Sequence, residues 1–104
     1  MKTKTLISEN EMPVVGFGTF TLQGETCKKS VLKALELNYR HIDTAEDYQN
    51  EKDVGAAINE SNVPREDIFL TSKVWKDNLH YDEVINSCNT TLEDLQLDYL
   101  DLYL

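Results

Sequence analysis

Cysteine, proline and glycine are all scarce in this sequence of 104 residues, which contains two, two and four of them. Two cysteines are too few for the disulfide framework of a small secreted domain. Cys27 and Cys88 each lie in a stretch of helical periodicity without metal-ligand spacing, so we expect buried or half-buried free thiols in a reducing cytosol. No linker or low-complexity run interrupts the chain, which indicates one domain at most.

Basic residues and long apolar runs are also lacking. Ten basic residues stand against 19 acidic ones, giving a net charge of −9, and such a chain lacks the basic patches that nucleic acid and anionic membranes require. No stretch approaches the ~20 apolar residues of a membrane span, and residues 1–7 lack the apolar run of a signal peptide. We therefore expect a cytoplasmic protein without nucleic-acid or membrane partners.

What the sequence does contain is an alternation of strand-like and helix-like segments. Apolar runs predict strands, and apolar residues at helical spacing predict the helices between them. We expect a short hairpin over 5–15 with its turn at 8–11, strands over 14–20, 39–43, 67–75 and 99–104, and helices over 26–38, 51–61 and 82–96. Because strands and helices alternate, the sequence predicts an α/β fold with a parallel sheet.

Some packing details can be expected within these elements. The glycines of strand 14–20 would permit close backbone approach, and Gly55 would allow helix 51–61 to pack tightly. The charged residues at 51–53 and 93–94 are interpreted as exposed helix faces. Helix 82–96 would turn four side chains inward, namely Val84, Cys88, Leu92 and Leu95.

Polar side chains end two of the predicted strands. Asp43 ends the strand 39–43, and Lys73 lies 30 residues later, about the length of one βαβ unit. The two should therefore meet at the carboxyl ends of neighbouring strands and form an ion pair. His41 shares the strand face of Asp43 but lies one layer deeper, where we expect a hydrogen-bonded interior histidine. Tyr48 follows Asp43 by five residues, at the start of the next helix.

Together, Asp43, Lys73 and Tyr48 suggest proton transfer to a carbonyl group. A phenol normally titrates near ~10, and a neighbouring ammonium lowers that value by favouring the phenolate. A phenol tuned in this way can donate a proton to a carbonyl oxygen while a hydride reaches the carbonyl carbon. Without Tyr48, a structural salt bridge between Asp43 and Lys73 would explain the pattern equally well.

The ordered set of motifs resembles the amino-terminal part of an aldo-keto reductase. The segments that carry the resemblance are 16–20, 39–48 with Asn50, Glu51, Val54 and Gly55, then 70–75, and finally Leu95 with 98–104. The resemblance implies a (β/α)8 TIM barrel, of which the chain would hold a hairpin and roughly the first three and a half βα units. It also implies reduction of aldehydes and ketones with NADPH, NADH being possible.

The resemblance assigns roles to individual residues. Tyr48 would be the general acid, Lys73 the group that tunes it, and Asp43 the partner of Lys73. The residues near the nicotinamide would be Gly18, Thr19, Phe20 and Asp43. The walls of the pocket for a small carbonyl substrate would come from Phe20, Tyr48 and Trp75, with Phe20 standing where many relatives carry tryptophan or tyrosine.

The resemblance also implies parts that these 104 residues do not contain. In the family a histidine follows the fourth strand, just past the position of Leu104, and later segments hold the adenosine phosphate with basic residues. A complete barrel needs ~250 residues, so we interpret residues 1–104 as a single partial barrel domain. Alone, it should be inactive, and its open strand edges should make it self-associate.

Two other functions remain open from the sequence. One is a non-catalytic barrel that acts as a binding or structural subunit, which an intact Asp43, Tyr48 and Lys73 disfavours only in part. The other is a small flavodoxin-like binding domain. Such a domain would need a phosphate-binding loop after a strand, and none of the sequence patterns fits one: Gly16-Phe17-Gly18 is not followed by a third glycine or a lysine at the required spacing.

Overall fold

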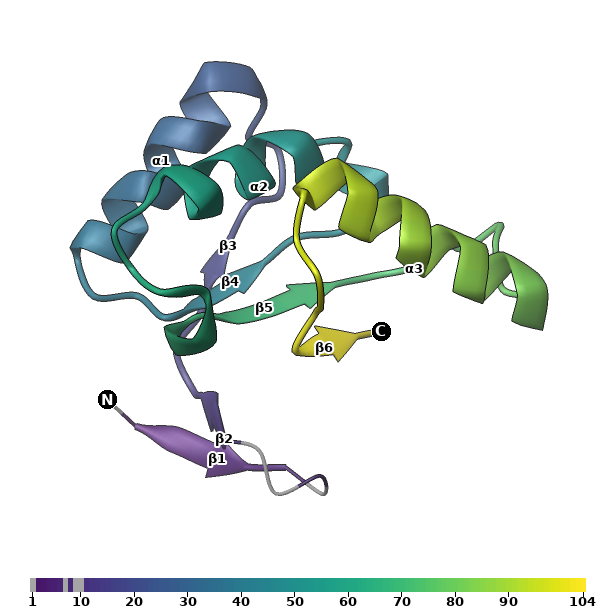
Figure 1. Ribbon diagram of the computed structural model, residues 1–104, viewed down its shortest axis with the longest axis horizontal. Helices are drawn as coiled ribbons and strands as arrows, with labels where there is room; N and C mark the ends of the chain where they lie inside the picture. Colours follow the sequence, from purple (N-terminus) through teal and green to yellow (C-terminus); the bar gives the residue numbers. More distant parts are fainter. Residues whose placement is uncertain (1, 7, 9–10) are drawn as a thin grey trace.

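A computed structural model describes residues 2–6, 8 and 11–104. The chain begins with an antiparallel hairpin of β1 (Thr3–Thr5) and β2 (Glu11–Pro13). The hairpin lies apart from the helices, below the amino ends of the other strands (Figure 1). The predicted hairpin is thus confirmed, while Glu9 and Asn10 of its predicted turn lie outside the described residues.

Four parallel strands form the central sheet, in the order in which they occur along the chain. They are β3 (Phe17–Gly18), β4 (His41–Asp43), β5 (Phe69–Ser72) and β6 (Leu102–Tyr103). The predicted alternation and parallel sheet are confirmed, but β3 is shorter than the predicted 14–20. Val14 instead donates its backbone N–H to Lys2 of the hairpin, and Val15 is exposed, so both residues belong to the connection into the sheet.

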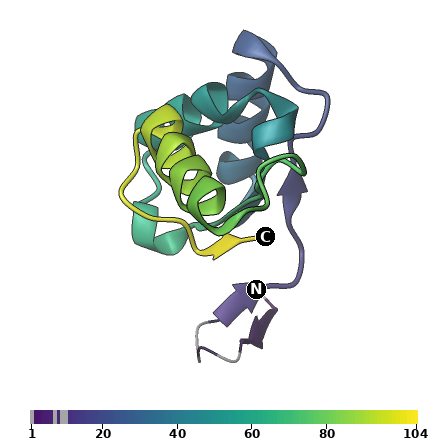
Figure 2. The same cartoon turned by 90° about the vertical axis from the view of Figure 1, so that its right-hand side faces the viewer.

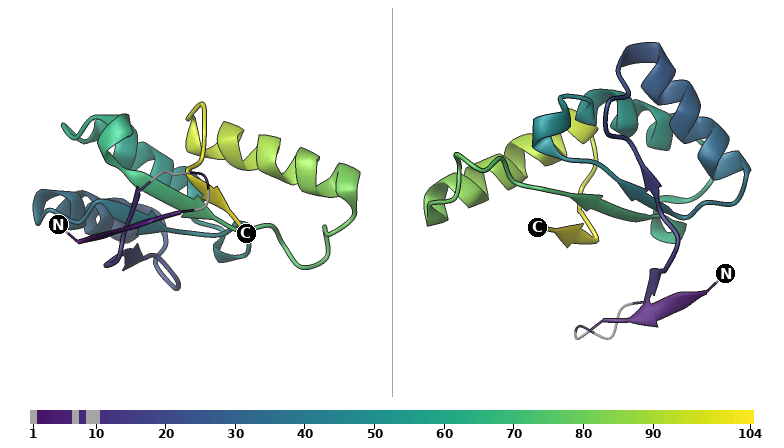
Figure 3. Two further views of the ribbon diagram at one scale, coloured as in Figure 1. Left: turned by 90° about the horizontal axis from the view of Figure 1, so that it is seen from below. Right: turned by 180° about the vertical axis from the view of Figure 1, so that it is seen from behind.

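Three helices cover one face of this sheet, as two perpendicular views show (Figures 1 and 2). They are α1 (Gly24–Glu36), α2 (Glu51–Glu60) and α3 (Tyr81–Leu95). Short 3-10 turns connect β4 to α2 at Glu46–Tyr48 and α2 to β5 at Arg65–Asp67. The view from behind shows the loop after β5 carrying the chain beyond the sheet before α3 returns (Figure 3). None of the helices in the described part of the chain could cross a membrane.

The core lies between the sheet and these helices. Gly55 sets the distance between α2 and α3, because a Cβ added there would lie 2.1 Å from the carbonyl oxygen of Leu95. The prediction of tight packing at Gly55 is therefore confirmed. The buried cluster comprises Cys27, Val31, Leu35, Ile42, Val54, Ala57, Ile58, Ile68, Leu70 and Leu95.

The inward face of α3 was predicted wrongly except at Leu95. Its buried residues are Ser87, Thr91 and Leu95, whereas Val84, Cys88 and Leu92 are only half-buried. The apolar spacing misleads here because the side chain that α3 must meet is a carboxylate, described below, and a hydroxyl satisfies it better than an alkyl group. The predicted free thiols are confirmed: Cys27 is buried, and its burial, followed by the charge of Asp53, raises its pKa to about 11.

Gly16, just before β3, and Gly18, which ends β3, differ in how closely other atoms approach them. A Cβ on Gly16 would lie 3.0 Å from Nδ1 of His41, so close approach is confirmed at this position. A Cβ on Gly18 would meet nothing within 4 Å, so the same prediction is wrong there. Gly18 is exposed at the carboxyl end of β3 and opens onto solvent.

Candidate active site

Asp43 and Lys73 meet at the carboxyl ends of neighbouring strands, as predicted. In the parallel register of β4 and β5, Asp43 stands beside Thr71, which places Lys73 just beyond it. The Lys73 Nζ donates to Asp43 Oδ1 over 2.5 Å. Both side chains keep about a third of their surface accessible, 31% for Lys73 and 36% for Asp43. The ion pair is therefore formed and still open to a ligand.

Tyr48 completes the predicted arrangement. It ends the 3-10 turn after β4, and Gln49 then adopts a left-handed conformation that leads into α2. The Tyr48 hydroxyl lies 3.3 Å from Lys73 Nζ. The same Nζ donates to the backbone oxygen of Thr44 over 3.2 Å. An ammonium has three N–H donors, so Asp43, Thr44 and Tyr48 account for all three.

The surroundings of Lys73 favour its charged form. Burial opposes the charge, but the hydrogen bonds to Asp43 and Tyr48, together with the charge of Asp43, outweigh it and raise the pKa of Lys73 above its ordinary value. Lys73 is therefore an ammonium at neutral pH. The Lys73 ammonium therefore places a positive charge 3.3 Å from the Tyr48 oxygen.

The last residue of β3 and the segment after it bring three more predicted residues to this end of the sheet. Thr19 is buried, and both its backbone N–H and its hydroxyl donate to the backbone oxygen of Asp43 over 3.0 Å. Phe20 is 66% exposed, and its ring centroid lies 5.2 Å from that of Tyr48. Gly18 provides open space beside them. The structure therefore brings Gly18, Thr19 and Phe20 together with Asp43 and Tyr48.

Trp75 and His41 have other surroundings. Trp75 is half-buried in the loop after β5, where its indole N–H donates to Asp77 Oδ2 over 2.8 Å. A role for Trp75 in a pocket wall stays a prediction. His41 is hydrogen-bonded, as predicted, but it is half-buried here: its Nδ1 lies 3.3 Å from the oxygen of Pro13, and its Nε2 lies 3.0 Å from the Thr71 hydroxyl.

A polar cluster that the sequence patterns did not indicate lies behind the strand ends. Glu51 was interpreted as an exposed charge, but only 5% of it is exposed, so that interpretation is wrong. Its Oε2 accepts from the Ser72 hydroxyl over 2.6 Å, and its Oε1 accepts from the Thr91 hydroxyl over 3.1 Å. Asn50, next to it, is 1% exposed. One signal could have indicated the cluster: Ser72 ends β5 directly before Lys73, so strand alternation points its side chain into the helix layer.

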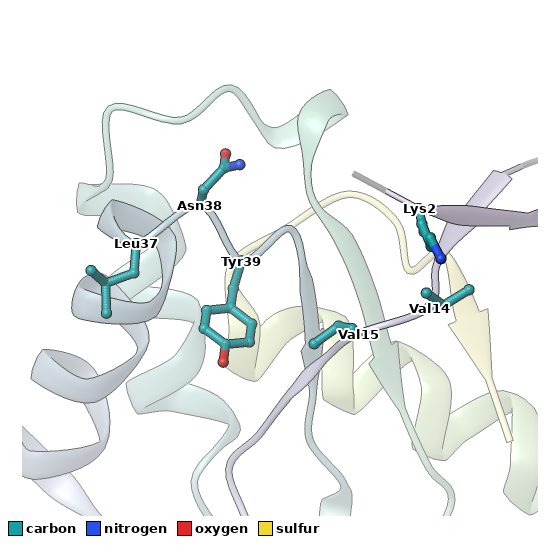
Figure 4. A pocket seen from close by; sticks show the side chains of 6 residues that line it. All are labelled: Lys2, Val14, Val15, Leu37, Asn38 and Tyr39. Carbon is teal, nitrogen blue, oxygen red and sulfur yellow. The ribbon is translucent and has the colours of Figure 1, made fainter.

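A cavity of about 430 Å³ lies at the other end of the sheet (Figure 4). The side chains that line it come from the hairpin, from the approach to β3 and from the segment between α1 and β4, and they are Lys2, Val14, Val15, Leu37, Asn38 and Tyr39. These segments precede their strands, so the cavity opens at the amino ends. It is therefore separate from the arrangement around Lys73.

Comparison with known proteins gives a consistent match. The profile of the Aldo/keto reductase family matches residues 14–104. The chain is 48% identical over 108 aligned residues to the NAD(P)H-dependent D-xylose reductase of Scheffersomyces stipitis, covering 100% of this chain and 34% of that protein. It is also 48% identical over 93 residues to the methylglyoxal reductase DkgB of Escherichia coli O157:H7, covering 89% of this chain and 35% of that protein.

Solved structures agree with the sequence matches. An aldo/keto reductase from Brucella melitensis superimposes with a TM-score of 0.96 at 42% identity, covering 99% of this chain and 39% of that one. An aldo-keto reductase from Bombyx mori in complex with NADP gives a TM-score of 0.90 at 38% identity, covering 98% and 36%. The chain thus spans about a third of the length of the curated relatives it matches. Its half-sheet and helices are part of the (β/α)8 barrel of these proteins.

Proposed function

We propose that this chain, which belongs to the aldo/keto reductase family, supplies the proton-donating side of an active site that reduces aldehydes or ketones to alcohols. The observation that carries the proposal is the position of Lys73, whose ammonium contacts the Asp43 carboxylate and the Tyr48 hydroxyl together. NADPH, or NADH, would supply the hydride. The three roles follow from the chemistry of these side chains.

In this mechanism Tyr48 is the general acid. The carbonyl oxygen of the substrate lies against the Tyr48 hydroxyl, and the phenol proton moves to it as the carbonyl carbon receives the hydride. The carbonyl becomes an alcohol and Tyr48 is left as a phenolate. Lys73 stabilises that phenolate, and Asp43 holds Lys73 in place.

The residues at the carboxyl end of β3 fit a nicotinamide ring. Gly18 presents backbone without a side chain, and a Cβ there would project into open space. Thr19 is fixed by its bonds to Asp43 and contributes a rigid edge. We assign the cofactor-binding role to Gly18, Thr19, Phe20 and Asp43. The net charge of −9 supplies little attraction for phosphates, so their cations would come from residues outside this chain.

The substrate is proposed to be a small carbonyl compound. The named relatives include a D-xylose reductase and a methylglyoxal reductase, whose names give small aldehydes as substrates. Phe20 and Tyr48, with rings 5.2 Å apart, would bound the pocket, and Trp75 would add a third wall. Phe20 is the most exposed of them and would contact the part of the substrate away from the carbonyl.

A chimaera tests the proposal directly. This chain replaces the equivalent amino-terminal segment of the S. stipitis D-xylose reductase, to which it is 48% identical. We expect NADPH oxidation that depends on added aldehyde across a broad aldehyde panel. A chimaera that binds NADPH but turns over none of the panel would favour the non-catalytic barrel instead.

The isolated 104 residues should be inactive and should self-associate. In the described residues β3 and β6 each have one strand neighbour, so each leaves an edge of unpaired backbone groups. Leu104 beside β6 and Val15 before β3 are 62% and 61% exposed. Light scattering should therefore show species larger than a monomer. A monomer with micromolar NADPH affinity would contradict this.

A further inference from the structure

The start of α2 contacts all three strand ends that carry the proposed site. Asn50 lies at the N-cap of α2, yet its side chain makes no capping bond. Its Oδ1 instead accepts from the Thr44 hydroxyl over 2.6 Å. Its amide nitrogen donates to the backbone oxygens of Thr19, over 2.8 Å, and of Leu22, over 3.0 Å. Asn50 thus joins the segment after β3 to the segment after β4.

Glu51 extends these links to β5 and α3. Its carboxylate accepts from Ser72, the last residue of β5, and from Thr91 of α3. Among the described residues it forms no ion pair. Burial raises its pKa above the ordinary value, although both hydroxyl bonds act in the opposite direction. A buried carboxylate without a cation is costly, so its retention at this point requires a compensating role.

The buried polar residues are concentrated in this one place. The structure describes eight of them, and six belong to the network around Asn50 and Glu51, namely Thr19, Thr44, Asn50, Glu51, Ser72 and Thr91. A site used only for packing would be filled more favourably by apolar side chains of similar volume.

The network lies directly behind the proposed site. Thr44 follows Asp43 in sequence, and Ser72 precedes Lys73. Successive side chains of a strand point to opposite faces, so Thr44 and Ser72 point into the helix layer when Asp43 and Lys73 point away from it. Fixing the two hydroxyls therefore fixes the backbone from which the two charged side chains project.

We propose that Asn50 and Glu51 are positioning residues, which hold the carboxyl ends of β3, β4 and β5 so that Lys73 reaches Asp43 and Tyr48 at the same time. They act through Thr44 and Ser72 and do not touch the reacting atoms. The expected effect on turnover rests on the proposed function, whereas the expected effect on Lys73 itself does not.

Two variants of β5, each lacking one side-chain hydroxyl, distinguish a positioning role from a contribution to stability. Ser72→Ala removes the bond to Glu51. Thr71→Val, the matched control, removes a buried hydroxyl one residue earlier, where it bonds to His41 3.0 Å away. Both variants should lower the melting temperature of the xylose reductase chimaera by a similar few degrees. Only Ser72→Ala should lower kcat, by about tenfold or more, with KM changed little.

The charge state of Lys73 gives a readout independent of turnover. The ¹³C shift of its side chain, titrated by NMR in the same chimaeras, should report a lower pKa in Ser72→Ala than in Thr71→Val, because burial persists while the bonds to Asp43 and Tyr48 weaken. Glu51→Leu should act like Ser72→Ala, and Glu51→Gln, which can still accept from Ser72, should restore most of the wild-type pKa.

The outcomes are distinct for the two proposals. If the wild-type chimaera has no turnover but the pKa of Lys73 responds as described, the proposed function fails and the positioning role stands. If Ser72→Ala and Thr71→Val change the pKa of Lys73 equally, the positioning role is overturned, whatever the chimaera catalyses.

Discussion

Two ion pairs stand at opposite ends of the same sheet. At the carboxyl ends, Lys73 pairs with Asp43 between β5 and β4. At the amino ends, Arg65 pairs with Asp101 between the turn before β5 and the segment before β6, over 2.9 Å. The pair at the amino ends is the more buried, with side chains 17% and 23% exposed against 31% and 36%.

The hydrogen bonds of the amino-end pair are all made within the fold. Arg65 donates to the backbone oxygens of Ile68 and Tyr99, and its guanidinium lies 4.0 Å from the centre of the Tyr99 ring. Asp101 Oδ2 also accepts from the backbone N–H of Leu70 over 2.8 Å. Every partner belongs to the strands or turns being joined, so this pair fastens β6 to β5.

The two pairs differ in their further partners: Arg65 also bonds to backbone oxygens, whereas Lys73 also contacts the Tyr48 hydroxyl. A guanidinium stays charged at any physiological pH and fixes geometry. An amine whose remaining donor faces a phenol can stabilise the charge left when that phenol gives up its proton. The Arg65 pair thus lies at the amino ends of the strands, and the Lys73 pair, for which we propose a catalytic role, lies at the carboxyl ends, where TIM barrels hold their active sites.

The largest expected effect is that of Tyr48→Phe in the xylose reductase chimaera. The variant removes the proposed proton donor and keeps the ring beside Phe20. We expect kcat to fall by about a thousandfold, within the usual range for a lost general acid, with NADPH affinity nearly unchanged. The control is Tyr39→Phe at the amino end, where the ring packs against Phe17. A kcat for Tyr48→Phe near that of the control would show that another group donates the proton.

Asp101→Asn should affect stability and leave turnover intact. The variant weakens the bond to the Leu70 N–H and leaves Arg65 without its carboxylate. Because the pair is partly exposed, we expect a loss of about 1–3 kcal/mol in the free energy of unfolding. Denaturant titration measures this, with the exposed Asp98→Asn as control. Equal stability of the two variants would mean that the amino-end pair does not fasten β6.

Gly18→Ala should change cofactor binding without changing stability. The added methyl group meets no protein atom within 4 Å, so the midpoint of unfolding should stay within error. If the nicotinamide passes over this backbone, the methyl group takes its space, and the Kd for NADPH should rise by about tenfold, or 1.4 kcal/mol. Fluorescence titration with NADPH decides, and an unchanged Kd would remove Gly18 from the cofactor site.

The smallest expected effect is a pH dependence at Glu51. Its pKa is raised in the folded state, so the folded protein binds this proton more tightly than the unfolded chain. Stability should therefore decline as the pH rises from about the ordinary value of 4.5 through the raised pKa. Glu51→Gln lacks this decline, so its stability relative to wild type should improve between pH 4 and pH 7.5, by roughly 1 kcal/mol or less. Glu93→Gln, at an exposed carboxylate of α3, is the control.

The strand-end residues could be predicted from the sequence because their placement depends on local rules. The spacing of Asp43 and Lys73 follows from the length of a βαβ unit, and the shared face of His41 and Asp43 follows from strand alternation. These rules involve one strand and its successor. They therefore predicted the ion pair and the strand face that His41 shares with Asp43.

The burial of Glu51 could not be predicted in this way. Its surroundings are set by Ser72 and Thr91, which lie 21 and 40 residues further along the chain. A charged residue in the first turn of a helix is most often exposed, and it also suits the helix dipole there. The buried side chains of α3 were predicted wrongly for the same reason, because Thr91 faces inward to bond to Glu51 and not to fill an apolar core.

The most direct test compares the two ion pairs in one experiment. Lys73→Met and Asp101→Asn chimaeras are purified alongside wild type, and kcat with NADPH and the free energy of unfolding are measured on the same preparations. The account predicts that Lys73→Met loses at least about a hundredfold in kcat with a smaller loss of stability than Asp101→Asn, which keeps near-normal kcat. A Lys73→Met chimaera with near-normal kcat, or a folded Asp101→Asn chimaera with an equal loss of kcat, would contradict it.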